Sequence, residues 1–243
     1  MKSIIIGAGT YGEVYLTYLQ EANIEVVGFL DDNPKFYGRK ICGVPVLGDI
    51  SILNILRTRY GIEAVYCPIG DNQVRAQILQ RAKTLGYATP NYIHPSVIVS
   101  PYVSIGEGVY ILLGSTIMPY TIIKNYTMIS MGVHIAHHSV IEEGCFFSTG
   151  CNFGASITAH KFSYCGISST IMTGIKELGE NCLIGAGAVV IHDVEPNSIV
   201  AGVPAKEIRK KTTNCLCDKS LGGVNYSCPL VMSHNKNRNR YAA

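Results

Sequence analysis

The chain has 243 residues, of which 47% are hydrophobic, enough for one large domain or two modest domains with real cores. Only 15% of the residues are charged and the formal net charge is +3, so the composition does not indicate a nucleic-acid-binding protein. No apolar run reaches membrane-spanning length, and the chain opens with Met-Lys and a strand-like run, so we expect neither a membrane partner nor a signal peptide. The nine cysteines, an odd number scattered along the chain, favour a reducing, cytoplasmic location.

Strand-like and helix-like segments alternate through the first 88 residues. Strands are expected at 2–6, 25–30 and 62–69, and helices at 13–20, 52–59 and 71–85. This alternation predicts an α/β, Rossmann-like domain over residues 1–88, with a nucleotide-sized crevice at the ends of its parallel strands.

A glycine-rich turn, Gly7-Ala8-Gly9-Thr10-Tyr11-Gly12, joins the first strand to the first helix. Glycines at this place let the backbone approach a phosphate at a helix N-terminus, or they only permit a tight turn. Asp31 and Asp32 end the second strand, where such folds contact a ribose or base. The rest of the chain offers no second catalytic domain for hydride transfer, so we favour a nucleotide-containing substrate over NAD.

One kind of residue then returns at every sixth position. Large apolar residues, with smaller ones near the end, form the series Ile93, Val99, Ile105, Ile111, Ile117, Ile123, Ile129, Ile135, Ile141, Phe147, Phe153, Ala159, Cys165 and Ile171, which resumes one residue late at Leu178, Ile184 and Val190. Small or β-branched residues stand two positions before almost every rung. A period of six fits neither a helix nor a free strand, and predicts a parallel β-helix with three short faces per coil over residues 89–211.

Residues 212–243 are polar and rich in Asn and Arg. Cys215, Cys217, Cys228 and His234 fit no standard zinc-finger spacing, so we expect a flexible or loosely docked tail there.

Histidines concentrate in one part of the coil. The rungs Ile135 and Ile141 are expected to point into the coil. The side chains of His134, His137 and His138 stand at other positions of the hexad and should therefore project outward. A side chain mounted on a rigid coil suits a general base, because an imidazole with an unperturbed pKa of about 6.5 can take a proton at neutral pH. Three solvated surface histidines are the alternative reading.

The hexads, the His137 region and the closing segments 185–190 and 201–206 together resemble the left-handed β-helix acyltransferases. More specifically, the chain is similar to the two-domain nucleotide-sugar N-acetyltransferases of the PglD type and to the sialic acid O-acetyltransferases of the NeuD type. The resemblance covers residues 1 to about 211.

The resemblance implies a homotrimer in which acetyl-CoA lies in a groove between neighbouring coils, with no metal. It implies that His137 is the general base for acetyl transfer to a nucleotide-linked 4-amino-sugar. Substrate contacts are implied at Gly7, Gly9, Thr10, Asp31, Asp32 and His138. Acetyl-CoA contacts are implied at Phe146, Ala155, Gly166, Ile167, Ala186 and Lys206.

The chain departs from the family pattern beside the base. Relatives often carry a carboxylate next to the catalytic histidine, where this chain has Ala136 and His138, so Glu142 and Glu143 are candidates to orient His137. A second histidine that some relatives have nine residues downstream is Phe146 here.

Three other functions stay open. One is sugar O-acetylation of the sialic acid type. Another is a zinc enzyme similar to γ-carbonic anhydrases, with His134, His137 or His138, and His160 as ligands shared across subunits. The third is a non-catalytic β-helix protein.

Overall fold

The computed structural model describes residues 1–211, and every structural statement below refers to them. The expected flexible tail at 212–243, with its cysteines and His234, lies outside the described residues.

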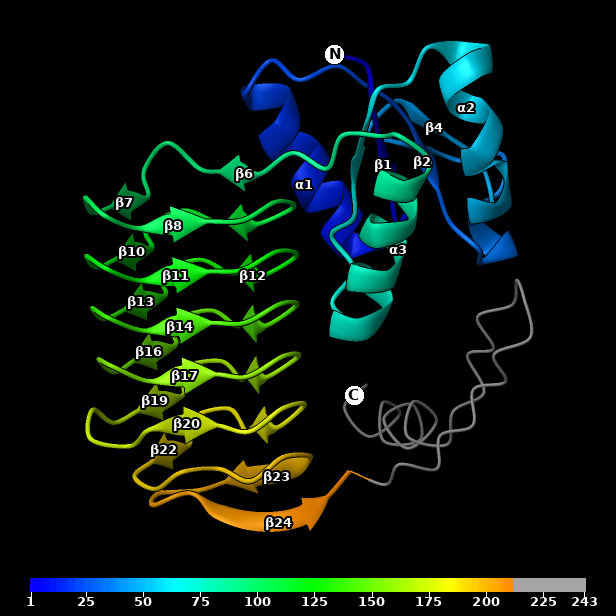
Figure 1. Ribbon diagram of the computed structural model, residues 1–243. Coiled ribbons are helices and arrows are strands. Elements are labelled where there is room, and N and C mark those ends of the chain that lie inside the picture. The colour runs from blue at the N-terminus through cyan, green and yellow to red at the C-terminus, as the bar shows by residue number, and fades with distance from the viewer. Residues whose placement is uncertain (212–243) are drawn as a thin grey trace, which may run out of the picture. The chain divides into compact units, whose positions relative to one another are not determined.

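The N-terminal part is the expected α/β domain, built on a five-stranded sheet in the order β3-β4-β2-β1-β5 (Figure 1). Its elements are β1 (Ser3–Ile6), α1 (Thr10–Glu21), β2 (Val26–Leu30), the 3-10 helices η1 (Pro34–Phe36) and η2 (Ile50–Ile52), β3 (Lys40–Ile41), β4 (Val44–Gly48), α2 (Leu53–Tyr60), β5 (Ala64–Tyr66) and α3 (Asn72–Thr84). Within this sheet β3 and β4 pair antiparallel and the other neighbours pair parallel. The short strands β3 and β4 were not expected from the sequence.

Alternating residues of β1 supply two cores. Ile4 and Ile6 pack with residues of α2 and α3, whereas Ile5 packs with Leu16 of α1. The helices therefore cover both faces of the sheet, as the alternation of elements predicts.

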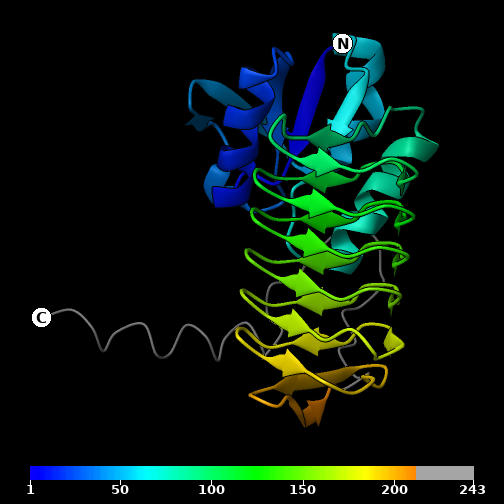
Figure 2. The ribbon, with the colours of Figure 1, turned by 90° about the vertical axis from the view of Figure 1, so that its left-hand side faces the viewer.

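The second part is a left-handed β-helix of two-residue strands that wind into three parallel faces (Figure 2). The first face holds β6 (Tyr92–Ile93), β9 (Tyr110–Ile111), β12 (Met128–Ile129), β15 (Phe146–Phe147), β18 (Tyr164–Cys165), β21 (Leu183–Ile184), β23 (Ser198–Ala201) and the antiparallel β24 (Lys206–Lys210). The second face holds β7 (Ile98–Val99), β10 (Thr116–Ile117), β13 (His134–Ile135), β16 (Asn152–Phe153), β19 (Thr170–Ile171) and β22 (Val189–Val190). The third face holds β8 (Ser104–Ile105), β11 (Ile122–Ile123), β14 (Val140–Ile141), β17 (Thr158–Ala159) and β20 (Glu177–Leu178).

The six-residue ladder lines the lumen, which confirms the predicted register. Every rung from Ile111 to Val190 is at most 2% exposed, and the small residues two positions earlier are buried beside them from Val109 onwards. The first two rungs, Ile93 and Val99, are 37% and 38% exposed because no coil lies above them. The rungs are therefore incompletely buried only at the N-terminal end of the β-helix.

The single extra residue predicted after Ile171 is present as a bulge. Phe153 pairs with Ile171 after 18 residues, whereas Ala159 pairs with Leu178 after 19. Thr173 and Ile175 bridge each other across Gly174, which has a φ of 109°. The inserted Ile175 turns inward and is 6% exposed.

The α/β domain packs on the first face of the β-helix through α1 and α3. Outward residues of that face are unusually large and apolar, and Tyr92, Tyr110, Met128 and Phe146 are 0–4% exposed in one core with residues of α1. The backbone N–H of Cys67 donates to the Tyr110 hydroxyl over 2.9 Å. This packing leaves the second and third faces clear of the α/β domain.

Arg75 of α3 lies at the centre of this junction and is fully buried. Its guanidinium donates to the carbonyls of Ile69, Tyr126 and Gly144, and to the Asn72 side chain, over 2.8–2.9 Å. No carboxylate of residues 1–211 pairs with it, so backbone dipoles from both parts of the molecule solvate the charge.

Among residues 1–211 no helix has both the length and the apolar character needed to cross a membrane.

Candidate active site

His137 stands at the corner between the second and third faces, here called the histidine edge. The corner joins β13 to β14, and hydrogen bonds from neighbouring coils hold it on both sides. His138 N–H donates to the Pro119 carbonyl above over 3.2 Å, and the His137 carbonyl accepts from Ser156 N–H below over 3.0 Å. The side chains of His134, His137 and His138 are exposed, which confirms that they project outward.

The two histidines of the corner contact each other directly. The Nδ1 atoms of His137 and His138 are 3.0 Å apart, and the two rings are T-shaped to each other, with an angle of 89° between their planes. Because this contact uses Nδ1 of His137, the nitrogen left for a substrate is Nε2.

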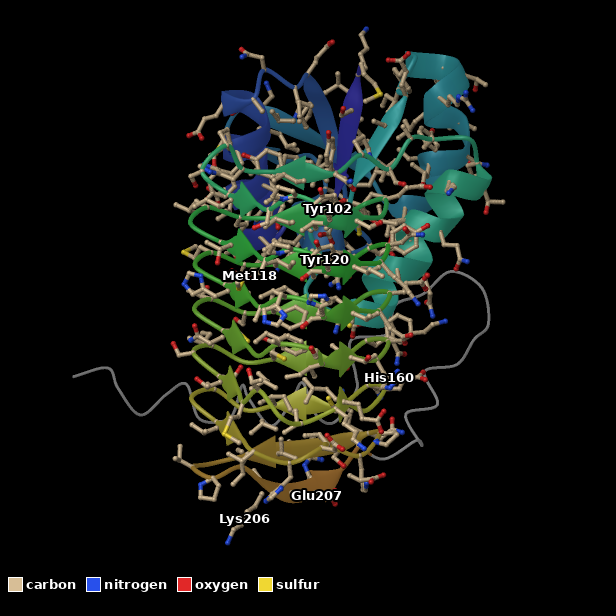
Figure 3. All side chains as sticks on the ribbon, turned by 60° about the vertical axis from the view of Figure 1, so that its left-hand side comes forward. Tyr102, Met118, Tyr120, His160, Lys206 and Glu207 are labelled. Carbon is tan, nitrogen blue, oxygen red and sulfur yellow. The ribbon has the colours of Figure 1, made fainter. Side chains whose placement is uncertain are left out.

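An aromatic column rises from His138 along the same edge. The Tyr120 ring lies 4.7 Å from that of His138, and Tyr102 stacks on Tyr120 at 5.3 Å and 3° (Figure 3). All three residues occupy the same place in successive coils and share a positive φ of 65°, 62° and 56° for Tyr102, Tyr120 and His138. The repeat of 18 residues per coil thus brings three rings into one stack.

A shallow hollow of about 350 Å³ lies on the second face beside the histidine edge. Among residues 1–211, its lining holds no Asp, Glu, Lys or Arg, and it includes His134, Thr116, Met118, Ala136, Asn152 and Met172. His134 Nδ1 is 2.8 Å from the Thr116 hydroxyl, so this histidine is engaged on the face and not with His137.

Neither glutamate that was considered as an orienting group makes a hydrogen bond to His137. Glu142 instead lies 3.3 Å from His160 Nδ1 and 3.4 Å from the Lys124 ammonium. Burial opposes ionisation of Glu142, but hydrogen bonds from His160 and Lys124 outweigh it, so the pKa of this carboxyl lies below its ordinary value. Glu142 is therefore committed to another edge, between the third and first faces.

His160, labelled in Figure 3, lies between the carboxylates of Glu142 and Glu177 on that other edge. Its Nε2 lies 3.1 Å from Glu177, and the hydrogen bond to Glu177, followed by that to Glu142, raises the pKa of His160 against the effect of burial. His160 and the corner histidines thus lie on different edges of one chain. Within residues 1–211 no three His, Cys, Asp or Glu side chains gather as a metal site.

The glycine turn leads into α1, with Gly9 at the N-cap of this helix. Gly7 has a φ of 103°, and a side chain at Gly12 would collide with the Gly7 carbonyl, whereas a Cβ at Gly9 would meet nothing within 4 Å. Gly9 caps α1 without a side-chain hydrogen bond, and Thr10 beside it is exposed. Of the three glycines of the turn, Gly9 is therefore the one with open space beside it.

Asp31 braces the glycine turn, whereas Asp32 binds the start of a different segment, η2. One oxygen of Asp31 accepts from Ala8 N–H over 2.7 Å and the other from Asn33 N–H over 2.8 Å. Asp32 accepts from Ile50 N–H over 2.9 Å through one oxygen. Asp31 thus shapes the glycine turn, while Asp32 is partly exposed.

Five of the six residues expected to contact acetyl-CoA lie in three places on the β-helix. Ala155 lies one coil below His137 on the histidine edge, and Gly166, Ile167 and Ala186 lie on the edge between the first and second faces. Lys206 opens the exposed β24 at the end of the β-helix (Figure 3).

Phe146 lies apart from these residues, inside the junction. Its ring stacks on Tyr164 at 5.0 Å, meets Tyr11 of α1 at 6.3 Å and is 3% exposed. Little of its surface is open to a ligand within one chain.

The comparisons with known proteins match both parts of the chain. Residues 2–82 fit the family model of the PglD N-terminal domain. PerB from Caulobacter crescentus, solved with CoA and GDP-perosamine, has a TM-score of 0.79 and 29% identity, covering 85% of this chain and 97% of that chain. The chain is therefore an acetyltransferase that is similar to the PglD-type sugar N-acetyltransferases in both of its parts.

Two further matches support the class of enzyme, an acetyltransferase. The acetyltransferase domain of PglB from Neisseria gonorrhoeae FA1090, in complex with acetyl coenzyme A, has a TM-score of 0.66 and 25% identity, covering 85% of this chain and 98% of that chain. Galactoside O-acetyltransferase of Escherichia coli (strain K12) is 28% identical over 165 residues, 54% of this chain and 77% of the relative.

Proposed function

We propose that this enzyme transfers the acetyl group of acetyl-CoA to the amino group of a nucleotide-linked amino-deoxy sugar, with His137 as general base. The observation that carries the proposal is the corner itself: His137 is exposed, its backbone is fixed by two coils, its Nδ1 is engaged by His138, and no residue within 1–211 makes a hydrogen bond to its Nε2. Fixed orientation is what a general base on a scaffold requires.

The proposed reaction is a direct attack. Nε2 of His137 takes a proton from the sugar amine as the amine nitrogen attacks the thioester carbonyl. The new C–N bond forms, the C–S bond breaks, and the CoA thiolate receives a proton. No covalent enzyme intermediate is needed, because the acceptor is itself the nucleophile.

Support for the acceptor comes from the glycine turn and from the relatives. The open N-terminus of α1 at Gly9 and Thr10 offers backbone N–H groups to a phosphate. PerB was solved with CoA and GDP-perosamine. A variant of the GDP-perosamine N-acetyltransferase of that organism, in which alanine replaces one histidine, was solved with the same two ligands at 27% identity and a TM-score of 0.79, covering 86% of this chain and 98% of that chain.

We also propose a homotrimer, in which a neighbouring copy covers the free edges and completes the acetyl-CoA groove. Met118, Tyr120, Ile122 and Ile167 are 43–55% exposed on edges and faces that the α/β domain leaves open. Exposed apolar side chains that recur along one surface favour burial by a partner. Light scattering coupled to size-exclusion chromatography tests the trimer.

Turnover of GDP-perosamine with acetyl-CoA, followed as release of the CoA thiol, tests the main proposal. His137→Asn should lower turnover by at least about 100-fold without changing the circular dichroism spectrum. His160→Gln, which replaces a half-buried histidine on another edge, is the control. Full turnover in His137→Asn contradicts the role of His137, and UDP- and dTDP-linked amino sugars extend the screen.

O-acetylation is the second candidate, favoured by the match to galactoside O-acetyltransferase. A hydroxyl acceptor of the same nucleotide sugar distinguishes the two, because an N-acetyltransferase requires the amine.

A further inference from the structure

We propose that His138 is a positioning residue that holds His137 in the tautomer required of a base. The inference rests on the proposed role of His137. It starts from the contact between the two Nδ1 atoms, 3.0 Å apart.

The tautomer follows from the chemistry of two imidazoles that meet through their Nδ1 atoms. One nitrogen must donate and the other accept, because a neutral imidazole has one of each. If Nδ1 of His138 donated, neutral His137 would carry its proton on Nε2 and could not accept one from an amine. A base at Nε2 therefore requires His137 to donate from Nδ1 and His138 to accept. The hydrogen bond at one ring nitrogen sets the state of the other.

His138 is itself held in place from two sides. Its backbone N–H donates to the Pro119 carbonyl, and the Tyr120 ring lies 4.7 Å from its own ring at a tilt of 33°. Tyr120 in turn stacks on Tyr102. The aromatic column therefore limits rotation of the acceptor ring, and the acceptor ring limits rotation of His137.

No charged group takes part in this arrangement. The titratable side chains that face the pair are Tyr120 and, beyond it, Tyr102; among residues 1–211 no carboxylate makes a hydrogen bond or ion pair with either histidine. A neutral acceptor fixes direction without adding electrostatic stabilisation to a protonated base. A carboxylate in place of the His138 ring should favour the protonated form of His137, so that less His137 is available to accept a proton at low pH.

Three substitutions at one position separate these effects. His138→Phe keeps the ring against Tyr120 but deletes the acceptor, and the conformation suits an aromatic residue because Phe162 and Tyr126 have a φ of 60° and 61° at equivalent corners. His138→Asn restores an acceptor one bond beyond Cγ, and Asn and Asp tolerate a positive φ. His138→Asp adds the charge.

The first measurement is independent of any substrate. Nitrogen-15 NMR of histidine-labelled protein, with the His137 signals assigned from His137→Asn, reports which ring nitrogen carries the proton. We expect Nδ1–H in the unmodified protein and in His138→Asn, and a shift toward Nε2–H in His138→Phe. The spectra are recorded with EDTA, so that a metal bridging the two nitrogens is excluded as the cause.

The second measurement is turnover of GDP-perosamine with acetyl-CoA against pH. His138→Phe should lower kcat by about 10- to 100-fold with little change in KM for acetyl-CoA, and His138→Asn should recover most of the loss. His138→Asp should move the acid limb of the profile to higher pH by about one unit. His160→Gln serves again as the control.

The outcomes distinguish the two proposals. An unchanged His137 tautomer in His138→Phe overturns the positioning role, whatever the substrate. Full turnover in His137→Asn overturns the proposed general base but leaves the tautomer result standing. Equal losses in His138→Phe and His138→Asn also overturn the positioning role, because the restored acceptor would then have no effect.

Discussion

Replacing Arg75 with Met should strongly destabilise the protein, because Arg75 joins the α/β domain to the β-helix. The side chain is fully buried, and burial lowers the pKa of its guanidinium below the ordinary value. Arg75→Met keeps an unbranched chain in the same space and deletes every donor. The carbonyls of Ile69, Tyr126 and Gly144 then lose the only hydrogen-bond donor that residues 1–211 supply to them.

The magnitude follows from those three carbonyls. A buried acceptor left without a partner costs about 1–3 kcal/mol. The lower end applies here, since the substitution also removes the cost of burying a cation. We therefore expect a loss of about 3 kcal/mol in the free energy of unfolding, at about 1 kcal/mol per carbonyl. For a chain of this size that loss lowers Tm by about 6 to 12 °C.

Thermal unfolding followed by circular dichroism and calorimetry measures the loss. Arg81→Met is the matched control, because Arg81 is exposed on the same helix, α3. Arg75→Lys should fall between the two, since it keeps the charge but not the planar set of donors. A stability for Arg75→Met within about 1 kcal/mol of Arg81→Met, the spread expected for a surface change, would refute the reasoning.

Three further predictions concern other parts of the chain. Gly12→Ala should destabilise the α/β domain by about 1–3 kcal/mol, because the new methyl group meets backbone, whereas Gly9→Ala should leave stability unchanged and weaken GDP binding in calorimetry. Ile135→Ala should cost about 2–5 kcal/mol in denaturant unfolding, because this rung is 1% exposed. The pKa of His160 is raised, mainly by Glu177, so its stabilisation is present at low pH and lost as pH rises through that pKa. The stability difference from His160→Gln should accordingly shrink as pH rises above about 6.5, the ordinary pKa of histidine, and stay below about 1 kcal/mol because the site is partly exposed; a difference that grows with pH contradicts it.

The coil could be predicted from the sequence because its period is local and repeats many times. Each rung needs only its own position in the hexad, and the outward direction of His137 follows from its place beside Ile135. The exposed first rungs, Ile93 and Val99, show the limit of such a pattern, since burial also depends on a neighbouring coil.

The junction could not be predicted in the same way, because it joins positions far apart in the chain. Tyr110 and Phe146 occupy outward positions that the hexad marks as surface, yet α1 covers them. A signal was present: large apolar residues recur every 18 residues on one face only. The hydrogen bonds of Arg75 reach residues 51 to 70 positions away, which no local pattern reveals.

The site residues show the same difference between local sequence patterns, which could be predicted, and contacts between distant positions, which could not. The glycine turn was visible as a motif, but the role of Asp31 in bracing that turn depends on how β2 lies against it. Glu142 is close to His137 in the sequence, yet β14 lies between the two residues and places Glu142 at the next corner, beside His160.

The bulge between Ile171 and Leu178 indicates where the chain tolerates a change in length. One extra residue leaves the pairing of β17 with β20 and of β19 with β22 intact, because the surplus backbone projects at a corner where Gly174 is exposed. Exposed corners with small residues accept insertions best. A short peptide tag or a fluorophore-bearing loop at Gly174 would therefore label the β-helix beside its second face without breaking the ladder below it.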